Sequence, residues 1–201
     1  MAIIHDIAVN HLRPTQITVG MIEVHEKIKH LKELRDRPHH LKDFLANNLI
    51  PVVKGPEDKF FVTDHHHLGR AIWEAGIDGA SLDVGADLSN LADPAFWQEM
   101  DRRKLVHPYD DRGHKQDFDR IPHHVKQLLD DPYRSLAAHV RYAGGYDKTP
   151  TPFAEFQWAD FFRPRIKAEL LKDDFDKAVR QALTFAGSAA CEKLPGYIER
   201  K

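Results

Sequence analysis

Apolar residues follow a helical period over residues 21–45. Spacings of three and four predict an amphipathic helix that begins at Met21 and ends before Pro38, and then a shorter helix that stops at Asn47-Asn48. The apolar positions of the two helices are Met21, Val24, Ile28, Leu31, Leu41, Phe44 and Leu45.

Shorter apolar runs, rich in β-favouring residues, flank these helices. The predicted strands cover residues 3–12, 17–20, 50–53, 60–63 and 80–86. A turn at 55–58 joins the third and fourth strands, so this pair should form a hairpin. A helix over residues 65–75, ended by Gly76, leads to the last strand.

The second half of the chain has mainly helical patterns. Helices are expected over residues 95–103, 122–129, 132–142 and 173–189, and a surface loop over 105–120. The aromatic block at 153–162 has roughly helical spacing and should lie in the core. The predicted fold class is α+β: a small mixed α/β domain over residues 1–90, followed by a mostly helical half over residues 91–201.

Charge and cysteine content limit the classes of function. The 201 residues carry 29 Lys and Arg against 31 Asp and Glu, a net charge of −2. This charge balance argues against a protein whose whole surface binds nucleic acid, and no sequence-specific DNA binding is expected. The single cysteine, Cys191, fits a reducing compartment. With no signal peptide and no membrane-spanning run, a cytoplasmic protein without a membrane partner is predicted.

The most informative stretch is the junction between the predicted strand at 60–63 and the helix that follows. Here Asp64, His65, His66 and His67 come directly after the strand, and Arg70 follows one turn later. A helix N-terminus has free N–H groups and a positive dipole end, so the junction predicts an anion site.

Helical geometry suggests a role for each residue of this cluster. Asp64 should cap the helix by accepting from the amide of His66 or His67. Arg70 would share a face with these two histidines and offer a planar fork to phosphate. The alternative is a capped helix whose histidines are merely solvated.

Metal binding is a competing interpretation of the same histidines. Three adjacent histidines on a helix point in different directions, and no spaced ligand pair completes a zinc pattern. No transition metal is therefore expected. Magnesium held by Asp64 together with nucleotide phosphates fits the residues better.

Two further segments have polar residues that could face this junction. One is 12–20, which contains Arg13, Thr15 and Gln16, although composition alone favours an ordinary loop. The other is 130–135 with 141–146, which is either a second polar wall of a cleft or only a helix start and a helix stop.

The order of four features resembles the ParB/sulfiredoxin-like superfamily. They are the sequence Leu12-Arg13-Pro14-Thr15-Gln16, the strand at 50–53, the hairpin, and the box Asp64-His65-His66-His67. More narrowly, the chain resembles the "Putative ParB-like nuclease" family of short bacterial proteins with an Asp-His-His-His box. That similarity runs nearly end to end, through segments 131–135, 144–146 and 153–156.

The resemblance implies an α/β domain whose box binds nucleotide phosphates. Partition proteins of the superfamily bind and hydrolyse CTP through a Gly-Glu-Arg-Arg box, which this chain lacks. Sulfiredoxins need a cysteine in the box, so sulfinic-acid reduction is set aside. The free serine kinases use a carboxylate from the early helix as base, and the candidates here are Glu23 and Glu26. Glu23 could equally pair with Lys27 on the surface.

The sequence as a whole predicts phosphate-ester chemistry, either hydrolysis by a nuclease or NTPase or transfer by a small-molecule kinase. The predicted site contains Asp64, His65, His66, His67, Arg70 and Glu23, with Arg13, Thr15 and Gln16 as the facing wall. Its expected ligands are a nucleoside di- or triphosphate, or another phosphorylated small molecule, with Mg²⁺. The alternative is a non-catalytic module that binds a nucleotide or a partner protein.

Overall fold

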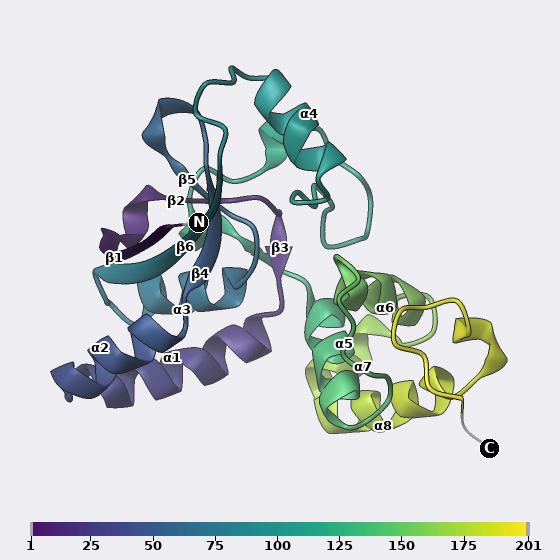
Figure 1. The fold of residues 1–201 in the computed structure, drawn as a ribbon. Coiled ribbons are helices and arrows are strands. Elements are labelled where there is room, and N and C mark those ends of the chain that lie inside the picture. The colour runs from purple at the N-terminus through teal and green to yellow at the C-terminus, as the bar shows by residue number, and fades with distance from the viewer. Residues whose placement is uncertain (1, 200–201) are drawn as a thin grey trace.

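The computed structural model describes residues 2–199, so residues 1 and 200–201 of the two predicted domains lie outside the described part. Within it, a mixed sheet of five strands has the order β1-β6-β4-β5-β2 (Figure 1). The strands are β1 (Ala2–Ala8), β2 (Leu12–Pro14), β4 (Ile50–Lys54), β5 (Phe60–Val62) and β6 (Gly79–Asp87). The predicted hairpin is confirmed, since β4 and β5 pair antiparallel.

The strand predicted over residues 3–12 is wrong in one respect. A 3-10 turn, η1 (Val9–His11), divides it into β1 and β2, which lie at opposite edges of the sheet. β1 pairs antiparallel with β6, whereas β2 pairs parallel with β5. Local alternation of apolar residues cannot reveal this division, because the two halves are extended for different, non-local partners.

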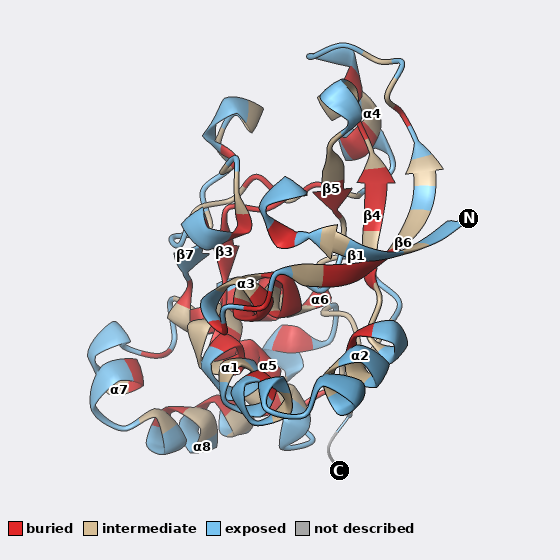
Figure 2. Cartoon of the chain, turned by 90° about the vertical axis from the view of Figure 1, so that its left-hand side faces the viewer, coloured by how far each residue is buried: buried red, intermediate tan, exposed pale blue. Residues whose placement is uncertain are grey.

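Three helices cover one face of the sheet. They are α1 (Met21–Arg35), α2 (Pro38–Asn47) and α3 (His66–Glu74), and each agrees with a predicted helix. Ile50 and Val52 of β4, with Val62 of β5, join Val24 and Leu31 of α1 in one apolar cluster. These five residues are buried. Figure 2 shows β4 mostly in the colour of buried residues, whereas β1 and α2 are largely exposed.

The opposite face is covered by α4 (Ala95–Arg102) and by the segment that follows it. Val53 and Phe61, the alternate residues of β4 and β5, pack here against Phe96 and Met100. The predicted surface loop at 105–120 is only partly exposed, because Val106 belongs to this cluster. The sheet is therefore buried on both faces at its centre.

The helical half consists of α5 (Pro132–Tyr142), α6 (Ala154–Phe162), α7 (Ala168–Asp173) and α8 (Phe175–Ala186). These helices enclose a core of their own, as expected for the aromatic block. Tyr146 stacks on Trp158 with ring centroids 4.2 Å apart and donates its hydroxyl to the carbonyl of Ala137. The predicted fold class, a mixed α/β part followed by a mostly helical half, is confirmed.

Two predicted helices differ from the structure. Residues 122–129 contain only the 3-10 turn η4 (Val125–Gln127), because β7 (Leu129–Asp130) pairs with β3 (Thr18–Val19) instead of continuing a helix. The last helix is shorter than expected, because Asp174 interrupts the helical backbone and caps α8 through the amide of Lys177. None of the helices within residues 2–199 has the length and apolar character needed to cross a bilayer.

The domain boundary at residue 90 stays a prediction, but the apolar clusters show which residues pack with each half of the chain. Val125 and Leu128 lie in the cluster between the sheet and α1–α3, whereas the cluster of the helical half starts at Tyr133. Residues up to about 128 therefore pack with the α/β part.

This packing predicts different effects for two neighbouring leucines. Leu128→Ala removes a side chain that is 3% exposed and should lower the free energy of unfolding by about 2–4 kcal/mol. Leu129, 54% exposed, is the matched control, and Leu129→Ala should change stability by less than about 0.5 kcal/mol. Urea unfolding measures both, and equal effects would contradict the assignment.

Candidate functional site

The predicted box, residues 64–67, lies between the end of β5 and the first turn of α3, as expected. The capping of α3 differs from the prediction. Asp64 accepts a hydrogen bond from the adjacent amide of His65, at 2.6 Å, and not from His66 or His67. His65 is the N-cap residue, in a left-handed conformation with φ of 61°. Both Asp64 and His65 are exposed. The bend at His65 turns the next two side chains inward.

His66 is buried and accepts a hydrogen bond. Its Nε2 receives the backbone N–H of Thr15 at 3.1 Å, and the Thr15 hydroxyl donates to the carbonyl of Val62 at 2.7 Å. Burial lowers the pKa of His66 to about 3, against the opposing charge of Asp64. The ring is therefore neutral near pH 7, and an Nε2 that accepts places its proton on Nδ1.

His67 makes the corresponding contact with the start of α1. Its Nε2 accepts the backbone N–H of Gly20 at 3.1 Å and lies 3.7 Å from Oε1 of Glu23. Burial, followed by the charge of Arg134, holds the pKa of His67 well below its usual value. Both inward-facing histidines are thus neutral acceptors that fix neighbouring backbone.

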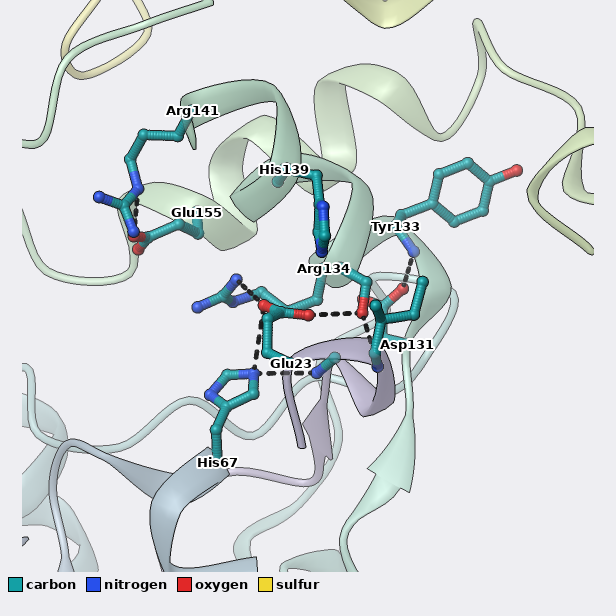
Figure 3. Close-up of polar contacts among 12 residues, drawn as sticks. Glu23, His67, Asp131, Tyr133, Arg134, His139, Arg141 and Glu155 are labelled. Atoms are coloured by element: carbon teal, nitrogen blue, oxygen red, sulfur yellow. Dashed lines mark hydrogen bonds and ion pairs between the residues drawn. The ribbon is translucent and has the colours of Figure 1, made fainter. Parts of the chain in front are cut away.

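Glu23 lies at the centre of these contacts (Figure 3). Only 5% of it is exposed, so the alternative of a surface pair with Lys27 is wrong. The Ser135 hydroxyl donates to Oε2 at 2.6 Å, and Nη1 of Arg134 donates to Oε1 at 3.3 Å. Burial raises the pKa of this carboxyl, and Arg134 opposes the rise. The other candidate, Glu26, is exposed.

Three helix N-termini meet around this carboxylate. Besides Gly20, α1 has the amide of Met21 bonded to Asp130 at 2.9 Å and the amide of Ile22 bonded to the Ser135 hydroxyl at 3.3 Å. α3 contributes His67, and α5 contributes Arg134 and Ser135 from its first turn. The positive ends of three helices therefore surround one buried negative group.

The segment 130–135 is a helix start, as one of the two alternatives predicted, because Asp131 caps α5 through the amide of Tyr133 at 3.0 Å and Pro132 is in the first turn. Arg134 (Figure 3) and Ser135 also bind Glu23, whereas the wall of a cleft stays a prediction. The helical half thus supplies part of the site.

Sequence reasoning missed His107. Its amide donates to the carbonyl of Thr15 at 2.8 Å, and its ring stacks against Tyr109 and Phe156 at 4.4 and 4.1 Å. Burial lowers its pKa to about 3. The available signal was the apolar pair Leu105-Val106 just before it, which is unusual in an exposed loop.

Several predicted site residues have other contacts. Arg70 binds Glu74 at 2.8 Å and the carbonyl of Leu128 at 2.8 Å, so its guanidinium is already paired, and its binding to phosphate stays a prediction. Arg13 donates to the carbonyl of His123, and Gln16 donates to the carbonyl of Thr18. Of the predicted facing wall, Thr15 is the residue whose contact with a box histidine is established.

The side chains around the box do not form a metal site by themselves. Among residues 2–199, no three His, Cys, Asp or Glu side chains are grouped so that they could hold one. Asp64 supplies one exposed carboxylate, with one oxygen already accepting from His65. Such a group fits an Mg²⁺ ion only when a bound phosphate supplies most of the other ligands.

The comparisons with known proteins agree with the resemblance drawn from the sequence. A family model described as "Putative ParB-like nuclease" matches residues 5–164. The chain belongs to this ParB-like family. The match extends from β1 to the end of α6, so the ParB-like region includes the residues of α5 that contact Glu23.

A solved structure resembles this ParB-like protein over its whole length. The crystal structure of protein Atu1540 from Agrobacterium tumefaciens is 42% identical, with a TM-score of 0.90. The similarity covers 100% of this chain and 98% of that chain. Among curated proteins, none matches.

The buried histidines predict acid sensitivity. The unfolded chain protonates His66 near pH 6.5, whereas the folded chain does so only near pH 3, so stability should fall as pH decreases through that window. His66 alone contributes a slope of about 1.4 kcal/mol per pH unit. His66→Gln keeps an acceptor for Thr15 and should reduce the slope by about that amount in urea unfolding at several pH values. His40→Gln, at an exposed position, is the control, and equal slopes in both variants would exclude His66 as the cause.

The Glu23–Arg134 contact predicts strong thermodynamic coupling. In a double-mutant cycle with Glu23→Gln and Arg134→Met, the coupling energy should be about 1–3 kcal/mol, because each single substitution leaves the other buried side chain without its charged partner. Arg141 and Glu155, 3.3 Å apart but more exposed, give the control cycle, with coupling below about 1 kcal/mol. Equal coupling in the two cycles would show that burial does not strengthen the Glu23 pair.

Proposed function

We propose that this ParB-like protein is a phosphate-ester hydrolase, of the nuclease or nucleotide-hydrolase type, with its site at the N-terminus of α3. The observation that carries the proposal is the proximity of His67 of the box to Glu23 of α1, with 3.7 Å between Nε2 and Oε1. It places a buried carboxylate next to a helix N-terminus, and these are two groups that can serve phosphate hydrolysis.

The proposed phosphate-binding position is the first turn of α3. The first backbone hydrogen bonds of this helix are those that the amides of Leu68 and Gly69 donate to the carbonyl of His65. The preceding amides, of His66 and His67, donate to no acceptor within residues 2–199. Two free N–H groups at a positive dipole end bind a phosphate oxygen well. Exposed Asp64 and His65 border this terminus.

Arg134 takes the role first predicted for Arg70. One of its nitrogens binds Glu23, while its Nε is buried and has no hydrogen-bond partner within residues 2–199. The Nε of Arg141 also lacks a hydrogen bond, but it lies 3.3 Å from a carboxylate oxygen of Glu155. An unsatisfied guanidinium N–H is costly to bury, and a phosphate oxygen would satisfy it. The Arg134 cation would stabilise negative charge that develops in the transition state.

Glu23 is the proposed general base. Burial raises its pKa above the usual value, which makes the carboxylate a stronger base, although Arg134 opposes the rise. The hydroxyl of Ser135 and the guanidinium of Arg134 fix its two oxygens. Asp64 is proposed to help to hold Mg²⁺ carried by a bound nucleotide.

One observation favours the second candidate, a nucleotide-binding module without turnover. The Nε2 atoms of His66 and His67 already accept backbone N–H groups, so neither is free to move a proton in this conformation. Bound nucleotide recovered unchanged under all metal conditions would favour this module over the hydrolase.

The proposal is tested with nucleoside triphosphates, short oligonucleotides and Mg²⁺. Wild-type protein should show a ligand-induced rise in melting temperature and release of product. Arg134→Met should lose most of that rise. Arg141→Met, on the same helix and also paired with a glutamate, should keep it. Glu23→Gln should retain binding but lower turnover by about 10²-fold. Unchanged binding in Arg134→Met would place the phosphate elsewhere.

Asp64→Asn separates capping from charge. Asn retains an oxygen that accepts from the amide of His65, so the melting temperature should stay normal. Loss of the carboxylate charge should reduce Mg²⁺-dependent turnover by about 10²-fold. A stable, fully active variant would leave Asp64 with a capping role alone.

A further inference from the structure

A second pocket, with a volume of about 390 Å³, lies against the face of the sheet opposite α3. Phe61 of β5 lines it, whereas the adjacent Val62 faces the core beneath α3. Because alternate residues of a strand point to opposite faces, this pocket is separate from the α3 terminus. Its volume is within the range of pockets that bind small molecules.

Aromatic rings form much of the pocket wall. Trp97 and Phe118 stack nearly parallel, with centroids 5.7 Å apart and planes 15° apart. Phe61 meets Trp97 edge-on at 5.5 Å. Trp97 and Phe118 are only half-buried, so both rings keep surface that another planar ring can cover. Such a wall favours a flat aromatic ligand.

The polar lining contains both signs of charge, with Arg13, Lys59 and His123 on one side of the balance and Glu57, Asp93 and Asp119 on the other. Lys59 is paired with Glu57, and Arg13 donates to the carbonyl of His123, so part of the positive charge is already engaged. The carboxylates of Asp93 and Asp119 line the same pocket and have no bonded partner within residues 2–199. Free carboxylates accept hydrogen bonds from amino groups and do not attract anions.

We propose that this pocket binds a heteroaromatic base that bears an exocyclic amino group, as in adenosine. The base stacks on Trp97 or Phe118, and its amino group donates to Asp93 or Asp119, as carboxylates accept from base amino groups elsewhere. The proposal rests on the proposed function for the choice of a nucleoside as ligand, and it adds a nucleoside site on the face of the sheet opposite the proposed phosphate site.

The test is a titration of the full chain with adenosine, which carries no phosphate, followed by NMR of the tryptophan indole N–H groups. The chain has three tryptophans, Trp73, Trp97 and Trp158, and Trp97→Phe assigns the relevant signal. Adenosine should shift the Trp97 signal and leave the other two unchanged. Inosine, which has an oxo group in place of the amino group, should bind about tenfold more weakly.

Three variants keep the test independent of folding. Phe118→Leu should weaken adenosine binding about tenfold, by loss of stacking. Phe44→Leu, a half-buried position on α2, should leave it unchanged. Asp93→Asn with Asp119→Asn should abolish the preference for adenosine over inosine.

The outcomes separate this proposal from the function of the α3 site. Adenosine binding at Trp97 without turnover of any phosphate ester would support the pocket and contradict the hydrolase. Turnover without a Trp97 shift at millimolar adenosine would overturn the pocket proposal alone. Equal binding of adenosine and inosine by the wild type would overturn the role of the carboxylates.

Discussion

Burial of one carboxylate, Glu23, is the constraint on which the arrangement of this protein depends. A buried charge left without partners costs several kcal/mol. Here Arg134 and Ser135 supply a cation and a hydroxyl from α5, and the start of α1 faces His67 of α3. Because the compensation comes from three helices, α1, α3 and α5 are fixed relative to one another. The α/β part and the helical half therefore meet at this point (Figure 3).

Neighbouring acids strengthen the same junction. Asp130 caps α1, while Asp131 caps α5 and binds Arg163 of the helical half at 2.9 Å. The short pairing of β3 with β7 places both acids beside the start of α1. The residues around Glu23 therefore hold the two parts of the fold together. His66 and His67 accept backbone N–H groups there, and a cation from the helical half pairs with Glu23.

The sequence predicted the box, the early-helix carboxylate and the segment 130–135, but not how they meet. The box could be found because a strand, a polar cluster and a helix are contiguous in the chain. The contact of Arg134 with Glu23 was not predicted, because a contact between residues 111 positions apart is not visible in a sequence, whereas the helical spacing that singled out Arg70 is. The surface role considered for Glu23 failed for the same reason: its i,i+4 neighbour was visible and its true partners were not.

The sequence by itself determined most of the regular elements, the family and the position of the strand-to-helix junction. These depend on local periodicity, on turn residues and on motifs that are continuous along the chain. The tertiary structure decided the features that depend on pairing between distant segments. These are the division of the first strand, and the short 3-10 turn followed by β7 where residues 122–129 had predicted a helix. It also decided which side chains are buried. Burial sets the pKa of Glu23, His66 and His67, because the cost of a charge depends on groups that only the folded chain brings together.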